Sequence, residues 1–391
     1  MTDYLFADFQ RDDVLDEAGD VVEEAPFVYE ACADMDTIRQ RCLQRLEEYN
    51  EKNQSKQMNL VIFDDALRHL LRLARICGSP GGNILLVGVG GSGKQSLTKL
   101  SSFIIKQYFF QVKLTKTFNN TNLLENIKEL YRIAGPMGKS VSFIMTDAEI
   151  KSEAFLESIN SMLATGDIPG MIPKEDKDLF SLESKGVYSK EVGGKGYEPS
   201  ILELWNFFIS RVKDCLHMVL AFSPVGNKFR ERSQKFPSLF SQCSIDWFLP
   251  WPEDALIAVS SKFMGNFKMD AKKEVRSALE KHMGRCHDLV TEVCEIYFQR
   301  MRRRVFVTPK SYLSFIDLYK DVYKKKYDGI DVEDQNIKLG LDKLREAAQG
   351  VEELKVDLKK EEVKLKETQE KVDKLIKELE VENAKAKQTG E

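Results

Sequence analysis

Residues 85–100, "LLVGVGGSGKQSLTKL", join an apolar run to a glycine-rich turn and then to a helical pattern. A short apolar run bounded by a turn is typical of a strand buried in a parallel sheet. The turn fits the pattern G-x-x-x-x-G-K, with Gly88, Gly93 and Lys94 at the fixed positions. A strand, such a turn and a helix in this order predict a loop that wraps the phosphates of a nucleotide.

The chemistry of such a loop depends on backbone N–H groups that point inward, through conformations that a Cβ would obstruct. These donors and the positive end of the following helix bind phosphate oxygens, while Lys94 adds a mobile charge for the β- and γ-phosphates. A glycine-rich turn without a ligand is the simpler alternative, but the strand, the helix and the lysine all favour the loop. We assign nucleotide contacts to eight residues: Gly88, Gly90, Gly91, Ser92, Gly93, Lys94, Gln95 and Ser96.

The residue after the lysine normally carries the hydroxyl that binds magnesium. Here it is Gln95, and Ser96 comes one position later. One residue along a helix is a rotation of roughly 100°, so we expect Ser96 to point away from the metal. The glutamine amide oxygen is a longer and less constrained ligand. The sequence therefore predicts a weakened magnesium site, in which Ser96 is still a candidate ligand.

Residues 141–150, "VSFIMTDAEI", supply the second half of the site. Asp147 ends a predicted strand, where an aspartate can hold the shell of a magnesium ion. In hydrolytic relatives the next residue is a glutamate that aligns the attacking water, but here it is Ala148. Glu149 lies one step further and would face the opposite side of an extended chain. It either substitutes for the missing glutamate or has a structural role, so binding is predicted and fast hydrolysis is not.

Four polar residues after residue 222 are candidates for sensing a nucleotide. Ser223 follows a predicted strand and could sense the γ-phosphate from its end, as could Asn227. Arg230 and Arg232 precede "KFPSLF", where ring ATPases carry an arginine that reaches the nucleotide of a neighbouring module. A solvated surface charge is the alternative for either arginine.

Strand and helix patterns alternate along most of the chain, which predicts βαβ units and an α/β fold with a parallel sheet flanked by helices. Helical patterns at 34–53 and 61–77 precede the loop, and residues 253–326 look helical throughout. Two polar stretches, 11–26 and 175–200, are expected to be exposed loops. The strand candidates are residues 84–89, 111–115, 141–146, 217–222 and 244–248.

The last segment has an apolar residue at every seventh position, which predicts a coiled-coil helix. The companion positions are poor in either of two registers, because Lys355, Glu362 and Gln369 occupy one and Glu361 and Thr368 the other. Two registers are therefore supported almost equally. The stripe consists of Ile337, Leu344, Val351, Leu358, Leu365, Val372 and Leu379.

Beyond the phosphate loop, the chain resembles the fourth AAA+ module of a dynein heavy chain of the axonemal type, joined to the first helix of the stalk. The resemblance spans almost the whole chain and divides it into four parts: an N-terminal linker and helical segment (1–57), a large α/β subdomain (58–250), a helical lid (251–335) and a stalk helix (336–391). It rests on "YLFADF" (4–9), "EEYN" (47–50), "MNLVIFDDALRHLLRLARI" (58–76), "LATGDIPGM" (163–171), "LHMVLAFSPVG" (216–226), "FPSLFSQCSIDWF" (236–248) and "VTPKSYLSF" (307–315).

The resemblance implies a ring of six modules with the main hydrolytic site in the first, and a supporting, ATP- or ADP-bound role for this one. Val61 and Ile62 would flank the adenine, Lys310 could reach the phosphates from a lid helix, and Arg230 or Arg232 would serve the preceding module. The implied partners are the neighbouring AAA+ modules, a returning stalk helix and, through the stalk tip, a microtubule. The implied location is the cytoskeleton of the cytoplasm or of a ciliary axoneme.

The composition of the chain argues against several other classes of protein. A formal net charge of −4 argues against a general nucleic-acid-binding surface, and no apolar run is long enough to predict a membrane span. Seven cysteines without regular spacing, and no apolar leader, suggest a reducing intracellular compartment, and "YLFADFQ" near the start reads like the middle of a longer protein. His282, Cys286, His287 and Cys294 fit no common zinc spacing, and helical packing explains them better.

Three other functions remain open. The module could hydrolyse ATP actively with Glu149, or it could be a structural ring module with a vestigial site. An ABC- or SMC-type ATPase also combines a phosphate loop with a long coil, but there the coil separates the two nucleotide motifs, whereas here both precede it. We predict a nucleotide-binding regulatory module in which magnesium is weakly held and hydrolysis is slow or absent.

Overall fold

The computed structural model describes residues 5–11, 14–15, 21–23, 25–192 and 198–388. The chain divides into two compact units, residues 1–316 and 317–391. Among the described residues, the first unit contains every strand and most of the helices, and the second continues a single helix. In the part of the chain that the structure describes, no helix is both long and apolar enough to cross a membrane.

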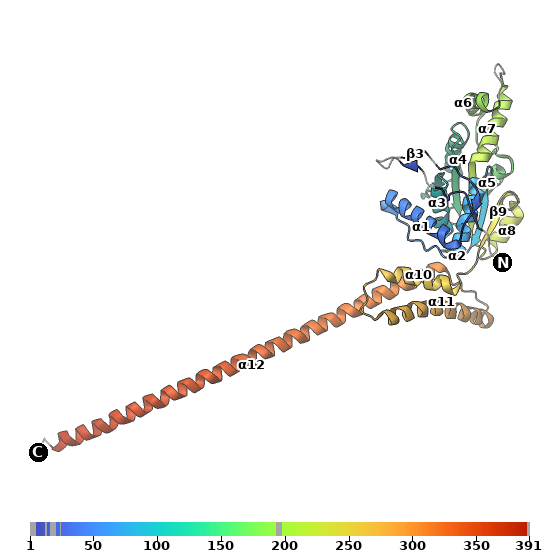
Figure 1. Cartoon of the computed structure of the whole chain (residues 1–391). Helices are drawn as coiled ribbons and strands as arrows, with labels where there is room; N and C mark the ends of the chain where they lie inside the picture. Colours follow the sequence, from blue (N-terminus) through green and yellow to red (C-terminus); the bar gives the residue numbers. More distant parts are fainter. Residues whose placement is uncertain (1–4, 12–13, 16–20, 24, 193–197, 389–391) are drawn as a thin grey trace. The chain divides into compact units, whose positions relative to one another are not determined.

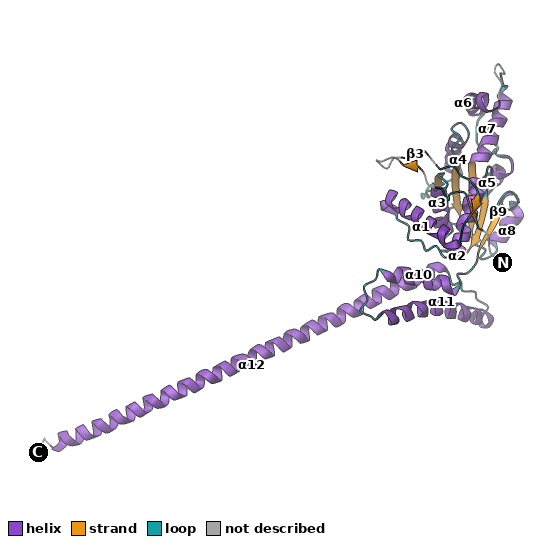
Figure 2. Ribbon diagram, viewed as in Figure 1, coloured by secondary structure: helices purple, strands orange, loops and turns teal. Residues whose placement is uncertain are grey.

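A five-stranded parallel sheet forms the centre of the first unit (Figures 1 and 2). All four strand pairs are parallel, which confirms the predicted α/β class. Parallel neighbours bring the carboxyl ends of the strands to one edge of the sheet, where ligands of such folds bind. In spatial order the strands are β6 (Tyr108–Gln111), β7 (Val141–Thr146), β8 (Leu216–Phe222), β5 (Ile84–Gly88) and β9 (Ser244–Phe248).

Helices cover both faces of this sheet, because alternate side chains of its central strands point to opposite faces. Leu85 and Val87 pack with α4 (Asn120–Ala134), α5 (Glu153–Thr165) and α7 (Ile201–Cys215). Ile84 and Leu86 pack on the other face, with α1 (Met35–Lys52), α2 (Asp64–Gly78) and α3 (Lys94–Ile104). The two hydrophobic cores hold the phosphate-loop strand rigidly from both sides.

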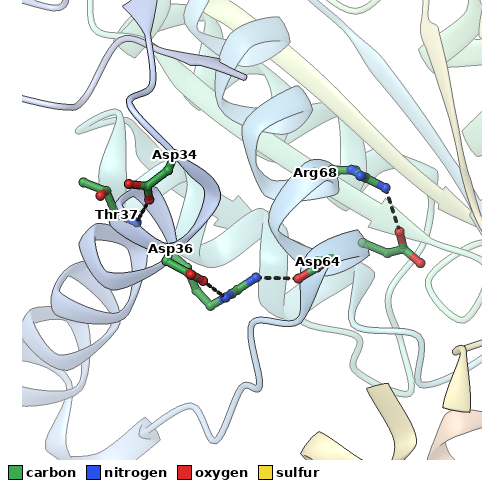
Figure 3. Close-up of polar contacts among 7 residues, drawn as sticks. Asp34, Asp36, Thr37, Asp64 and Arg68 are labelled. Carbon is green, nitrogen blue, oxygen red and sulfur yellow. Dashed lines mark hydrogen bonds and ion pairs between the residues drawn. The ribbon is translucent and has the colours of Figure 1, made fainter. Parts of the chain in front are cut away.

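The junction between α1 and α2 is fixed by charged side chains (Figure 3). Asp34 caps α1 by accepting a hydrogen bond of 2.6 Å from the Thr37 N–H. Arg39 forms ion pairs with Asp36 on its own helix and with Asp64, the first residue of α2. These contacts hold the start of α2 against α1, and residues 57–63 run between the two helices.

Two stretches that were predicted to be loops contain regular structure. Most of the insert at 175–200 is the helix α6 (Lys174–Glu191), which begins directly after Pro173. The prediction failed because the stretch is polar overall, yet Phe180 is fully buried and its ring stacks on Phe208 at 5.4 Å. Residues 193–197 lie outside the described part of the chain.

The acidic stretch at 11–26 contains two short antiparallel strands, β2 (Val14–Leu15) and β3 (Val21–Glu23), and its other predicted loop residues are only partly described. A further pair, β1 (Phe6–Ala7) and β4 (Glu30–Ala31), flanks it. The strand predicted at 111–115 was also misplaced. β6 ends at Gln111, because the aromatic residues that precede it form the edge strand.

Helices follow the sheet to the end of the described chain, as predicted. A short 3-10 turn, η1 (Gln54–Lys56), precedes α2. The helix α12 extends over 80 residues, which is about 120 Å at 1.5 Å per residue. All seven residues of the predicted heptad stripe are exposed on it. The remaining helices are α8 (Lys228–Lys235), α9 (Ser238–Ser241), α10 (Glu253–Gly265), α11 (Lys273–Met301) and α12 (Pro309–Gln388).

Candidate nucleotide site

The glycine-rich turn forms a tight loop between the end of β5 at Gly88 and the start of α3 at Lys94. Gly91 and Gly93 have φ angles of +83° and +93°, in the left-handed region where a Cβ is strained. The loop therefore needs glycine at these two positions. It presents its backbone at the N-terminus of an eleven-residue helix, where N–H groups without intrahelical partners favour an anion.

Lys94 lies inside the curve of its own loop. Its Nζ donates to the carbonyl oxygens of Gly88 at 2.7 Å and Val89 at 2.8 Å, and to the Ser92 hydroxyl at 3.0 Å. Burial lowers the pKa of Lys94 to about 8, and the charge of Asp147 opposes this shift. The amine is thus held at the mouth of the loop, with a carboxylate near it.

The first turn of α12 packs on the loop. A Cβ added at Gly91 would lie 2.6 Å from the Cβ of Lys310 and 2.7 Å from its backbone nitrogen. The Lys310 side chain is exposed, so the prediction that it reaches phosphates is sterically open but stays a prediction.

The segment that was predicted to flank an adenine directly precedes α2 and contacts α10. The Leu60 carbonyl accepts a hydrogen bond of 2.8 Å from Lys262 on α10, and the Phe63 ring meets Trp251 edge-on at 5.5 Å. Between them, Ile62 is buried and Val61 is half-buried. The segment is well anchored, and the role of Val61 and Ile62 stays a prediction.

Asp147 follows β7 and reaches the end of β8. Its Oδ2 accepts a hydrogen bond of 2.6 Å from the Ser223 backbone N–H, and its Oδ1 forms an ion pair with Arg232. The structure therefore brings together Asp147, Ser223 and Arg232, which were predicted as site residues on separate grounds. The Ser223 contact uses the backbone, whereas the sensor role predicted for this residue would use its hydroxyl.

Arg232 packs within its own chain. Its side chain is only 12% exposed and its guanidinium lies over the Phe222 ring, 5.0 Å from the centroid. Arg230, on the same short helix, is exposed. Arg232 thus contacts Asp147 of its own chain, whereas Arg230 faces solvent, and the role of either arginine toward a neighbouring module stays a prediction.

Glu149 lies in a buried polar niche. Its Oε2 accepts a hydrogen bond of 2.8 Å from the Thr146 N–H, and its Oε1 accepts one of 2.7 Å from the Gln111 amide at the end of β6. Burial raises the pKa of the Glu149 carboxyl, against the effect of these hydrogen bonds. This geometry favours the structural alternative for Glu149. The sequence prediction missed Gln111 because it placed that residue at the start of a strand.

The predicted magnesium ligands follow β7 and lie at the start of α3. Asp147 is the carboxylate at the strand ends, and its two oxygens already accept from Ser223 and Arg232. On α3, the Gln95 side chain is exposed and Ser96 is half-buried. Mg²⁺ prefers oxygen ligands, and Asp147, Gln95 and Ser96 all carry side-chain oxygens. The two oxygens of Asp147, however, already bind Ser223 and Arg232.

A cavity of about 160 Å³ lies on the β9 side of the loop, opposite the β8 side that carries Asp147. The start of α2, the loop and the end of β9 line it, with Phe63, Ser92 and Trp251 among the side chains. At its wall the His69 ring stacks on Phe248 at 3.9 Å and bonds Asp246 at 2.6 Å. No sequence pattern indicated this cavity, because its walls come from separate segments.

The histidines and cysteines considered for zinc lie along α11. His287 packs its ring on Tyr312, with 5.0 Å between centroids. Among the residues that the structure describes, no three His, Cys, Asp or Glu side chains are placed to hold a metal ion. Helical packing stays the predicted explanation for these four residues.

A parallel sheet in this order, with a phosphate loop after β5 and an aspartate after β7, defines a P-loop nucleotide-binding fold of the AAA+ class. The chain matches the family described as the P-loop containing dynein motor region D4 over residues 58–322, and it belongs to that family. The predicted family is thus confirmed.

Axonemal heavy chains are among its relatives. The chain is 44% identical to dynein axonemal heavy chain 8 of Homo sapiens over 91% of its length, and 44% identical to dynein axonemal heavy chain 5 of Mus musculus over 92%. It is 43% identical to the dynein gamma chain of the flagellar outer arm of Chlamydomonas reinhardtii over 90%. In each case the matching region is 8% of the relative's length, so the chain corresponds to one region of much longer proteins.

Proposed function

We propose that this chain is a nucleotide-binding module of an axonemal dynein motor, that it holds ATP or ADP in a supporting or regulatory role, and that it hydrolyses ATP slowly or not at all. The observation that carries the proposal is the asymmetry of the site. The phosphate-binding half is complete, with the glycine cradle and Lys94 in place. The half that would activate water has Ala148 beside Asp147, and Glu149 turned into a niche with Gln111.

The position of the cavity supports an orientation for the nucleotide. The phosphates would lie at the N-terminus of α3, between Lys94 and Asp147, on the β8 side of the loop. The base would lie toward β9, where the cavity adjoins Phe63, the residue after Val61 and Ile62. Magnesium, when bound, would neutralise phosphate charge, with Asp147 as its main protein anchor.

The role in the motor rests on the family and on the exposed stripe of α12. A helix that shows apolar side chains at every seventh position over six heptads needs a partner helix. We propose a returning stalk helix as that partner, neighbouring AAA+ modules on the ring, and a microtubule at the stalk tip. The axonemal names of the relatives favour a place in the cytoskeleton of a cilium or flagellum.

Two other functions compete with this one. An actively hydrolysing module would need Glu149 to leave Gln111 and Thr146 and to turn toward Asp147. A purely structural module would have a vestigial site that binds no nucleotide. The glycine loop has kept its phosphate-binding geometry, which argues against this alternative.

Nucleotide carried through purification tests the proposal directly. We expect the purified chain to release ADP or ATP on denaturation, and Lys94→Ala to release none while keeping the same circular dichroism spectrum. Single-turnover measurements with radiolabelled ATP should show hydrolysis that is slow compared with nucleotide release. Equal nucleotide content in both proteins, or none in the unmodified chain, would contradict nucleotide binding at the loop.

A further inference from the structure

The charges around the candidate phosphate position are unusual for a site that relies on magnesium. Lys94 and Arg232 both lie near the single carboxylate of Asp147. Ala148 contributes no charge, and Glu149 directs its carboxylate to Gln111 instead. The local sum is therefore two positive charges against one negative charge, before any ion or nucleotide is counted.

The Arg232 side chain is held in the site by contacts with Phe222 and Asp147. Its guanidinium packs over Phe222, the last residue of β8, and its side chain is mostly withdrawn from water. Asp147, with 37% of its side chain exposed, holds that guanidinium on one oxygen and is itself fixed by the Ser223 N–H on the other. A charge-assisted contact of this kind is strong and directional, so it places the cation at the carboxyl ends of β7 and β8.

A divalent cation would use the same carboxylate. Two cations that share one carboxylate repel each other, and each lowers the affinity of the site for the other. An arginine beside the phosphates can also neutralise their charge, as guanidinium groups do in phosphate-binding proteins. Arg232 therefore lowers the affinity of the site for a metal ion, and it also supplies part of the positive charge that the ion would bring.

We propose that Arg232 is a resident cation of the nucleotide site and takes over part of the electrostatic role of magnesium, so that this chain binds nucleotide with little dependence on Mg²⁺. The proposal rests on the proposed nucleotide binding and adds to it the regulation of that site. It also gives a reason why Gln95 can stand where a magnesium-binding hydroxyl is usual, because the ion is no longer required to hold the phosphates.

The test measures the coupling between Mg²⁺ and nucleotide, which is the ratio of the ADP dissociation constants in excess EDTA and in millimolar Mg²⁺. It uses the full 391-residue chain and a fluorescent ADP analogue at equilibrium. For the unmodified chain we expect a ratio below about three. For Arg232→Gln we expect the ratio to rise about tenfold or more, equivalent to about 1.4 kcal/mol of coupling. Because the readout is a ratio, an overall loss of affinity does not alter it.

Two variants separate this role from a structural one. Arg230→Gln removes the same charge from the same helix at an exposed position, and it should keep the ratio of the unmodified chain. Arg232→Lys keeps the charge but not the planar guanidinium, and it should restore most of the magnesium independence. Circular dichroism checks that each variant is folded.

The outcomes decide between the proposals. An unmodified chain that needs Mg²⁺ strongly, or an Arg232→Gln ratio equal to that of Arg230→Gln, overturns the role of Arg232 and leaves nucleotide binding in place. Loss of binding by both Arg232 variants in both conditions, with an intact fold, also overturns it, because the residue would then be essential for binding with or without the metal. An unmodified chain that binds no nucleotide in either condition overturns the proposed function and this inference with it.

Discussion

Gly91 and Lys310 are in direct contact: the phosphate loop and the first turn of α12 approach so closely that a Cβ at Gly91 would lie 2.6 Å from the Cβ of Lys310. The residues are 219 positions apart in the sequence. The helix that begins at this contact is the one that continues to Gln388. A change in the loop at Gly91 is therefore felt directly by the start of α12.

Gly91→Ala tests this contact. The added methyl group meets the backbone of Lys310 and also places a Cβ at a φ of +83°, which costs about 1–3 kcal/mol. We expect a lower melting temperature and a nucleotide affinity reduced by about tenfold or more, since about 1.4 kcal/mol is a factor of ten. For the melting temperature, Gly90→Ala is the matched control, because a Cβ there meets nothing within 4 Å. Equal effects of the two substitutions would refute the importance of the contact.

Glu149→Ala distinguishes the two roles open to this residue. If the residue is structural, its loss leaves the Thr146 N–H and the Gln111 amide without their buried acceptor, which costs about 1–3 kcal/mol of unfolding free energy. Single-turnover hydrolysis should then stay as slow as in the unmodified chain. Gln111→Ala should destabilise in the same direction by a smaller amount. A hydrolysis rate that falls sharply in Glu149→Ala, without a change in stability, would show that the residue acts on water instead.

Phe180→Ala measures how firmly α6 is attached. The ring is fully buried and stacks on Phe208, so truncation should cost about 3–5 kcal/mol of unfolding free energy in denaturant titrations. Leu179→Ala is the control on the same helix, because Leu179 is 44% exposed. Similar small losses for both would mean that α6 packs less tightly than described.

Because His217 is buried, we expect the free energy of unfolding to fall in mild acid. Burial lowers the pKa of this imidazole, whose Nδ1 lies 2.9 Å from the Gly82 carbonyl oxygen. Because the folded pKa lies below the unfolded value of about 6.5, the unfolded chain binds the proton more readily. Stability is therefore retained above that pH and falls as the pH drops below it, by at most about 1.4 kcal/mol per pH unit. Unfolding free energies at neutral and mildly acidic pH should differ less in His217→Gln than in the unmodified chain.

The sequence predicted those features that depend on local pattern. The strands at 141–146 and 244–248 are continuous in the structure as predicted, because apolar runs between turns identify buried strands. Features that depend on one buried ring or on tertiary approach were missed. Phe180 anchors α6 within a stretch that is polar overall. The ion pair of Asp147 with Arg232 joins residues that are 85 positions apart, and no local pattern indicates that they meet.

The two registers of the α12 stripe lead to a last prediction, which rests on the proposed stalk. All seven stripe residues are exposed, and Lys355, Glu362 and Gln369 occupy the companion positions of one register. Polar residues at such positions weaken that register, so the two registers stay within a few kcal/mol and a modest bias can shift one helix against its partner. Replacing all three by Leu in a complete stalk should favour one register by more than nucleotide binding can reverse. Microtubule affinity should then stop responding to nucleotide, and a response of unchanged size in the triple variant would rule out register balance as the signal.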